Sequence, residues 1–138
     1  MTAPAKRRKP APRAAKAALV VLDSSCWFEY FADTDRADLL APAIEAGEKL
    51  SGSVLTVYEV VKEIAREAGD EVASAALSLM QRGRLVDIDL SLALEAAVNG
   101  LPMADSLIYA VARQHGAALW TQDAHFDGLP GVQFFRKP

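Results

Sequence analysis

The stretch ALVVLD, residues 18–23, decides the fold: five apolar residues run without interruption into a carboxylate, Asp23. A short continuous apolar run is typical of a β-strand that is covered on both faces, as in a parallel sheet. Three further acids stand beside strongly hydrophobic segments, namely Glu59 in LTVYEVV, Asp105 in LPMADSLIYA and Asp123 in LWTQD. A carboxylate in such a setting is costly unless a cation balances it, which favours a divalent metal ion.

Short apolar runs and helical patterns alternate along the rest of the chain. The runs rich in β-branched or aromatic residues predict five strands, at residues 18–22, 53–56, 84–88, 117–121 and 132–135. Between them, apolar residues recur at helical spacing; one such segment places Leu90, Leu94, Ala97 and Val98 on one face. This order predicts an α/β sandwich with a mainly parallel central sheet flanked by helices.

The predicted sheet would bring the four acids together. The loops that follow parallel strands converge on one edge of the sheet. Asp23 and Asp123 follow predicted strands, while Glu59 and Asp105 lie in the first turns of predicted helices. One pocket could then hold Mg²⁺ or Mn²⁺ and, with phosphate oxygens as further ligands, hydrolyse a phosphodiester. Each acid also has a structural explanation; the clearest is Thr56-x-x-Glu59, which matches a capping box at a helix start.

Other candidate residues have weaker support. His115 and His125 lack a Cys or His partner at zinc-ligand spacing, so we expect surface or helix-end roles for both. The sequence contains no P-loop and no glycine-rich dinucleotide motif. Trp27 and Phe31 are expected in the core or in a contact between two copies of the chain.

Composition and charge fit one globular domain: of 138 residues, 51% are hydrophobic, and the net charge is −3. The first 16 residues carry six bases and no acid, so this part is about +6 and the remainder about −9. Because prolines oppose a helix there, we expect residues 1–16 to be a disordered basic arm and residues 17–138 to be the domain. A leader or a misassigned start would explain the same composition. The candidate nucleic-acid-binding residues of the arm are Lys6, Arg7, Arg8, Lys9, Arg13 and Lys16.

Cysteine content and hydropathy bear on the cellular setting. Cys26 is the single cysteine, which excludes an internal disulfide and suits a reducing cytoplasm. No apolar run reaches the ~18 residues that indicate a membrane span. We therefore expect a soluble, cytoplasmic protein that is not bound to a membrane.

Three sequence blocks resemble a known family. VVLDSSCWFEYF (20–31), LTVYEVVKEIAR (55–66) and LPMADSLIYAVARQHGAALWTQDAHFDGLPGV (101–132) are similar to PIN-domain ribonucleases of the toxin branch of type II toxin–antitoxin pairs, the VapC-like proteins. The resemblance implies a PIN-like three-layer sandwich. It also implies a Mg²⁺- or Mn²⁺-dependent endoribonuclease that is homodimeric and is held inactive by a cognate antitoxin.

The same resemblance assigns roles to individual residues. It implies four metal-binding acids, which are Asp23, Glu59, Asp105 and Asp123. Asp23 and Asp105 are expected to be the strongest metal ligands, with Ser25 and Thr121 as supporting polar groups. A metal-activated water would then hydrolyse an RNA phosphodiester. Housekeeping PIN-domain nucleases share these acids, so RNA processing without toxicity is an alternative.

Two further alternatives lie outside the nucleases. A phosphoacceptor signalling domain would use residues in a similar order, namely Asp23, Asp87 or Asp89, Thr121 and Lys137. The acidic pair that such a domain carries after its first strand is missing, because two serines follow Asp23. The other alternative is a domain that only binds a partner through its acidic pocket.

Overall fold

The computed structural model describes residues 19–47 and 49–137, and within them a five-stranded sheet forms the centre of the molecule. Its strands are β2 (Val20–Leu22), β3 (Leu50–Ser53), β4 (Arg84–Val86), β5 (Ala118–Thr121) and β6 (Val132–Phe134). They lie in the order β4-β3-β2-β5-β6, and every neighbouring pair is parallel. The predicted mainly parallel sheet is confirmed. The predicted basic arm and the predicted domain start at residue 17 lie outside the described residues.

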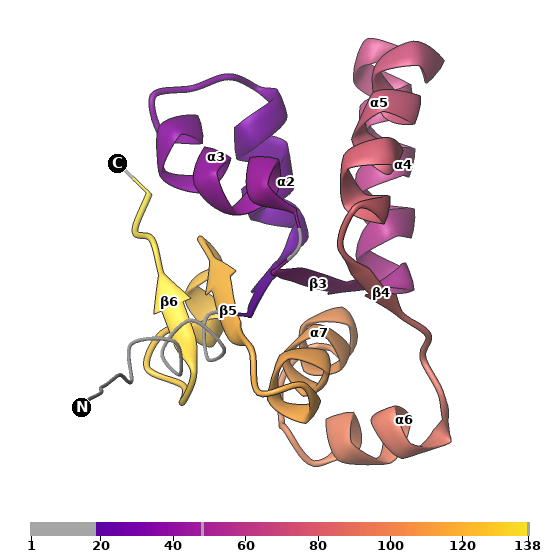
Figure 1. Cartoon of the computed structure of the whole chain (residues 1–138). Helices are drawn as coiled ribbons and strands as arrows, with labels where there is room; N and C mark the ends of the chain where they lie inside the picture. The colour runs from indigo at the N-terminus through magenta and orange to yellow at the C-terminus, as the bar shows by residue number, and fades with distance from the viewer. Residues whose placement is uncertain (1–18, 48, 138) are drawn as a thin grey trace, which may run out of the picture.

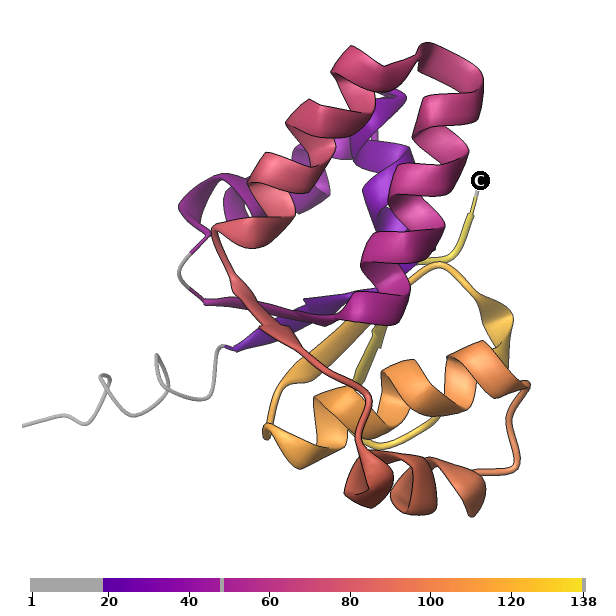
Figure 2. The ribbon, with the colours of Figure 1, turned by 90° about the vertical axis from the view of Figure 1, so that its right-hand side faces the viewer.

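Helices cover both faces of this sheet. They are α2 (Ser24–Phe31), α3 (Ala37–Ala46), α4 (Val54–Ala68), α5 (Asp70–Gln81), α6 (Leu90–Ala97), α7 (Met103–Gln114) and the 3-10 helix η1 (Ala124–Phe126). Figures 1 and 2 show α2 to α5 on one side of the sheet and α6 with α7 on the other. The predicted three-layer sandwich is therefore confirmed. None of the helices in the described part of the chain is both long and apolar enough to cross a membrane.

The burial of the central strand β2 on both faces explains the uninterrupted apolar run at residues 18–22. Val20 and Leu22 pack into the cluster formed with α2 to α5, whereas Val21 packs into the cluster formed with α6, α7 and η1. All three side chains are buried. Full burial of such a side chain stabilises a fold by about 1.5–3 kcal/mol, so β2 contributes to two cores at once.

The second strand differs from its prediction. The strand is Leu50–Ser53, not residues 53–56, and Val54 already begins α4. Ser53 caps this helix, since its Oγ accepts a hydrogen bond from Leu55 N at 2.9 Å. The capping box considered for Thr56 and Glu59 is therefore wrong: Thr56 lies inside the helix, and its buried hydroxyl has no hydrogen-bond partner within residues 19–47 and 49–137. Of the β-branched residues that suggested a strand, Thr56 lies on the buried face of α4 with Val60 and Ile64, whereas Val54 is exposed.

One surface prediction also needs correction. In α6 the buried residues are Leu92 and Ala96, so the predicted face bearing Leu90 and Leu94 points outward. The helix is apolar on nearly all sides, and periodicity therefore does not fix which side faces the core. Trp27 is buried in the core, which is the first of the two places expected for it and leaves it no surface for a contact between copies.

Candidate active site

The four acids gather at the edge where β2, β3 and β5 end. Asp23 directly follows β2 and Asp123 lies two residues beyond β5, while Asp105 is in the first turn of α7 and Glu59 in the second turn of α4. Burial raises the pKa of Glu59, Asp23 and Asp105, and the charges of the acids add to this rise: Asp105 and Asp23 act on Glu59, and Asp123 acts on both Asp23 and Asp105. The structure thus brings together the acids that the sequence singled out.

Asp23 is the most firmly held of them, with only 4% of its surface exposed. Its Oδ1 accepts hydrogen bonds from Ser25 Oγ at 2.5 Å and from Cys26 N at 3.2 Å. Thr121 Oγ1 donates to Oδ2, and the same hydroxyl accepts from Asp123 N at 2.9 Å. Burial raises the pKa of Asp23, and these hydrogen bonds oppose the rise. Ser25 and Thr121 therefore orient this carboxylate.

Glu59 is half-buried and carries an unsatisfied oxygen. Its Oε1 is buried without a hydrogen-bond partner among the described residues. Burial is the largest cause that raises the pKa of Glu59, followed by the charges of Asp105 and Asp23, while Ser24 lowers it. An orphaned carboxylate oxygen surrounded by like charges is an acceptor that lacks its cation or proton.

His125 is the residue that sequence reasoning missed. Its Nδ1 lies 2.9 Å from Asp105 Oδ2 and 3.2 Å from Asp123 Oδ1. Asp123 caps η1, since its Oδ1 accepts from His125 N at 2.9 Å, and this turn brings the imidazole back toward both acids. The hydrogen bond to Asp105 and the charge of Asp123 raise the pKa of His125. The two-residue spacing in DAH was the available signal, because such a turn returns the third residue to the first.

The donor atoms at this edge suit a divalent metal ion. Asp105, Asp123 and His125 each offer one ligand atom, and these three atoms lie within 4.8 Å of one another. Carboxylate oxygens are the ligands that Mg²⁺ prefers, and an imidazole nitrogen is more compatible with Mn²⁺ or a later transition metal. Burial raises the pKa of Asp23 and of Asp105, and the charge of Asp123 adds to both, so a cation would favour the ionised carboxylates; the orphaned Glu59 Oε1 is a further acceptor. The residues therefore fit such an ion.

The residues proposed for a phosphoacceptor domain lie differently. Asp89 caps α6, since its Oδ1 accepts from Leu92 N at 2.9 Å. Asp87 is exposed after β4, a strand at the edge of the sheet. Neither side chain belongs to the metal-ligating group found among the described residues.

Fold and site define the class of the protein. The PIN domain family model matches residues 20–132, and the chain belongs to this family. No curated protein sequence matches the chain.

Solved structures share the fold at low sequence identity. A toxin–antitoxin complex from Klebsiella pneumoniae is 22% identical with a TM-score of 0.69, and the match covers 83% of this chain and 95% of that one. DNA-bound VapBC from Salmonella typhimurium is 16% identical with a TM-score of 0.64, covering 86% and 97%. VapC20 from Mycobacterium tuberculosis, a sarcin–ricin loop cleaving toxin, is 19% identical with a TM-score of 0.59, covering 78% and 91%.

The raised pKa of Glu59 predicts a pH-dependent stability. The folded chain holds a proton on Glu59 more tightly than the unfolded chain, so this contribution to stability is complete below the unfolded pKa of about 4.3. It is lost as the pH rises through the folded pKa. In chelator-containing buffer at pH 7, Glu59→Gln should therefore unfold a few degrees above the wild type, and the difference should vanish toward pH 4. Thermal unfolding followed by circular dichroism measures both.

Glu95→Gln is the matched control, because Glu95 lies on α6 across the sheet from α4. The unfolding temperature of Glu95→Gln should equal that of the wild type at every pH. A Glu59→Gln variant that also follows the wild type would show that Glu59 is not under charge repulsion in the folded chain.

Proposed function

We propose that this protein is a metal-dependent endoribonuclease and the toxin of a type II toxin–antitoxin pair. The observation that carries the proposal is the gathering of four acids around an orphaned carboxylate oxygen at one edge of a PIN-domain sheet. VapC20, to which the chain is similar in fold, is described as an RNA-cleaving toxin. That likeness supports an RNA substrate and toxicity, beside the alternative of a housekeeping RNA nuclease.

Asp23 and Asp105, the expected metal ligands, would hold Mg²⁺ or Mn²⁺ together with Asp123, whose carboxylate lies beside that of Asp105, and Glu59 would complete the acidic edge. When bound, the ion supplies a lowered pKa for an attacking water and positive charge against the phosphate oxygens. The protein supplies the geometry. Ser25 and Thr121 fix the Asp23 carboxylate, so it does not need to reorganise when substrate arrives. The free Oε1 of Glu59 can accept a proton or a hydrogen bond at the same edge.

Asp105→Asn tests the metal assignment. It should abolish Mg²⁺- or Mn²⁺-dependent cleavage of single-stranded RNA while the chain remains folded, since it removes one carboxylate from a repelling group. A metal ion at 100 times its Kd stabilises a fold by about 2.7 kcal/mol, and this thermal shift should be largely lost in Asp105→Asn. Gel-resolved cleavage and thermal unfolding, each with and without metal, check the two effects.

Asp33→Asn is the control for that experiment. Asp33 is exposed beyond α2 and has a φ of 55°, a conformation that asparagine accepts. It should cleave RNA and respond to metal as the wild type does. Near-normal cleavage by Asp105→Asn would contradict the metal assignment, and no cleavage by the wild type with any metal would contradict the nuclease proposal.

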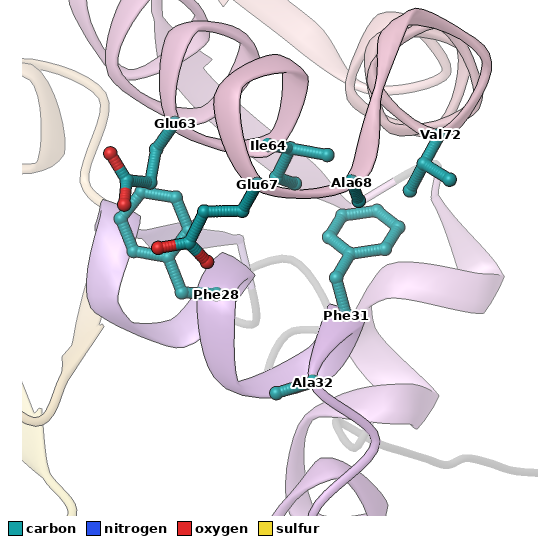
Figure 3. A pocket seen from close by; sticks show the side chains of 8 residues that line it. All are labelled: Phe28, Phe31, Ala32, Glu63, Ile64, Glu67, Ala68 and Val72. Carbon is teal, nitrogen blue, oxygen red and sulfur yellow. The ribbon is translucent and has the colours of Figure 1, made fainter.

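A groove between α2, α4 and α5 is a candidate docking site for an antitoxin partner. A cavity of about 400 Å³ is lined there mainly by apolar side chains, among them Phe28, Phe31 and Val72. Figure 3 shows Phe31 pointing toward Ala68 and Val72, while the carboxylates of Glu63 and Glu67 lie beside Phe28. The apolar floor is complementary to the apolar face of an amphipathic segment, and the two rim carboxylates share Arg66 within this chain, which leaves one net negative charge for a Lys or Arg of that segment. We propose that the cognate antitoxin docks here.

Charge reversal on the rim tests that groove. Expression of the chain alone should arrest growth, and co-expression of the adjacent small gene should restore it. Glu67→Lys should weaken the purified complex at least tenfold, because like charges facing each other cost on the order of several kcal/mol. Calorimetric titration measures the affinity. Asp35→Lys, an exposed position between α2 and α3, should bind as the wild type does. Equal affinities for both variants would place the antitoxin elsewhere.

The outward face of α6 fits the expected homodimer. Leu90, Leu94 and Val98 follow one another at four-residue intervals, and together with Met103 they are between 63% and 83% exposed. Glu95 is the one charged residue of α6. The row of Leu90, Leu94 and Val98 is therefore poorly suited to a cationic segment, but it is complementary to the same row on a second copy of the chain. A helix that is apolar on all sides is stable only when both sides are covered. We propose that two copies of the chain cover it mutually.

Leu94→Lys should therefore convert a dimer into a monomer at micromolar concentration. The lysine places two like charges near the axis of the contact and removes apolar area. Light scattering coupled to size exclusion reads out the mass. Leu39→Lys, an exposed leucine on α3 across the sheet, is the control and should remain dimeric. A monomeric wild type would contradict the dimer, and a dimeric Leu94→Lys would move the contact away from α6.

A further inference from the structure

A second pocket opens directly beside Glu59, on the outer side of α4. Its volume is about 300 Å³, and it is lined by Ser24 and Phe28 from α2 and by Tyr58, Glu59, Lys62 and Glu63 from α4. It therefore combines one acid of the catalytic cluster with an aromatic ring and a cation. The proposed reaction uses none of the side chains of Tyr58, Lys62 and Phe28.

Tyr58 and Lys62 form one unit on the helix surface. They are four residues apart, which places them on neighbouring turns of the same face. Lys62 Nζ lies 5.3 Å from the centre of the Tyr58 ring and 3.3 Å from its hydroxyl oxygen. Tyr58 is nevertheless 59% exposed, so the ring keeps surface for a further group. The pair therefore offers a ring face and a positive charge side by side on the helix surface.

The charge of Lys62 is available to a ligand. Arg66 binds both carboxylate oxygens of Glu63, the acid that directly follows Lys62 in the chain. Lys62 forms no ion pair with any carboxylate in residues 19–47 and 49–137. Its neighbours thus leave an ammonium group at the rim of an otherwise acidic pocket, and an anion that reaches this pocket meets Lys62.

We propose that Tyr58 and Lys62 form a nucleotide subsite that positions the RNA strand next to the phosphate being cleaved. The inference rests on the proposed function. A nucleotide in single-stranded RNA presents a base with an open face and a phosphate, which match an aromatic ring and an ammonium group in one pocket. Base stacking on an aromatic ring tolerates any base, so this subsite would hold the strand in register and would not read a sequence.

A purely structural role for the pair is the alternative. Tyrosine and lysine one turn apart stabilise a helix modestly, without any ligand. That role would lower the unfolding midpoint slightly when either residue is replaced and would leave RNA binding unchanged. Measurements on RNA therefore separate the two explanations.

Binding is measured on the full chain carrying Asp105→Asn, with a fluorescein-labelled single-stranded RNA oligonucleotide of mixed sequence. Adding Tyr58→Leu should weaken binding roughly fivefold or more, the loss that corresponds to one base stacked on an aromatic ring. Tyr58→Phe keeps the ring and should bind normally. Lys62→Gln should reduce the slope of log affinity against log salt by about 0.7, which is one phosphate contact to a single strand.

A spectroscopic probe reports the stacking itself. An oligonucleotide that contains 2-aminopurine should lose fluorescence on binding the Asp105→Asn chain, because the base stacks on Tyr58. The loss of fluorescence should be smaller when the chain also carries Tyr58→Leu. In the otherwise wild-type enzyme, Tyr58→Leu should raise KM for RNA more than it lowers kcat, because the subsite holds the strand away from the reacting atoms.

Lys49→Gln is the matched control for Lys62→Gln. Lys49 is exposed and precedes β3, so it lies at the edge of the sheet opposite the acids. For Lys49→Gln, the slope of log affinity against log salt should equal that of the parent chain carrying Asp105→Asn.

Three outcomes would overturn the subsite. If the wild type cleaves RNA and the Tyr58→Leu and Lys62→Gln variants bind and cleave it equally well, the subsite is wrong and the nuclease stands. Variants that lose only antitoxin binding would also overturn it, by assigning the pocket to the partner. A wild type that neither binds nor cleaves RNA would overturn the nuclease and the subsite together.

Discussion

The buried carboxylate of Asp23 is the constraint on which the rest of the site depends. An ionised group at 4% exposure costs several kcal/mol unless hydrogen bonds replace its water. Here Ser25, Cys26 N and Thr121 supply them, and these donors come from α2 and from the end of β5. Satisfying one carboxylate therefore joins the first strand, the first helix and a distant strand at a single point.

The position of Asp123 follows from the same contact. Thr121 donates to Asp23 and accepts from Asp123 N, so the backbone turns away from β5 at a defined place. That turn becomes η1, which returns His125 toward Asp105. Burial, together with the charges of the neighbouring acids, raises the pKa of Glu59 and Asp105, so the ionised cluster is costly until a cation balances it. A site that is under repulsion in the metal-free chain sacrifices stability for the ability to bind a cation.

Local rules in the sequence were enough for the architecture and for the four acids. Uninterrupted apolar runs mark strands that are buried on both faces, and acids directly beyond them must lie at the edge where those strands end. The failures concern features that packing decides. After Leu50, the strand at Leu50–Ser53 consists of small and polar residues, whereas Val54 and Thr56 belong to a helix that Ser53 caps. His125 joins the acids through space, by way of a turn whose shape depends on the contact between Thr121 and Asp23.

Helix α4 contributes residues both to the proposed RNA-cleaving site and to the proposed antitoxin groove. One side packs into the core through Val60 and Ile64, while Glu59 reaches the acidic edge. The outward side carries the pocket beside Glu59 and, further along, the groove between α2, α4 and α5. Phe28 and Glu63 line both cavities. A segment that fills the groove would cover these two residues and narrow the pocket in which we place the RNA strand. Competition for shared surface would then be enough to inhibit the enzyme, and no conformational change of the sheet would be required.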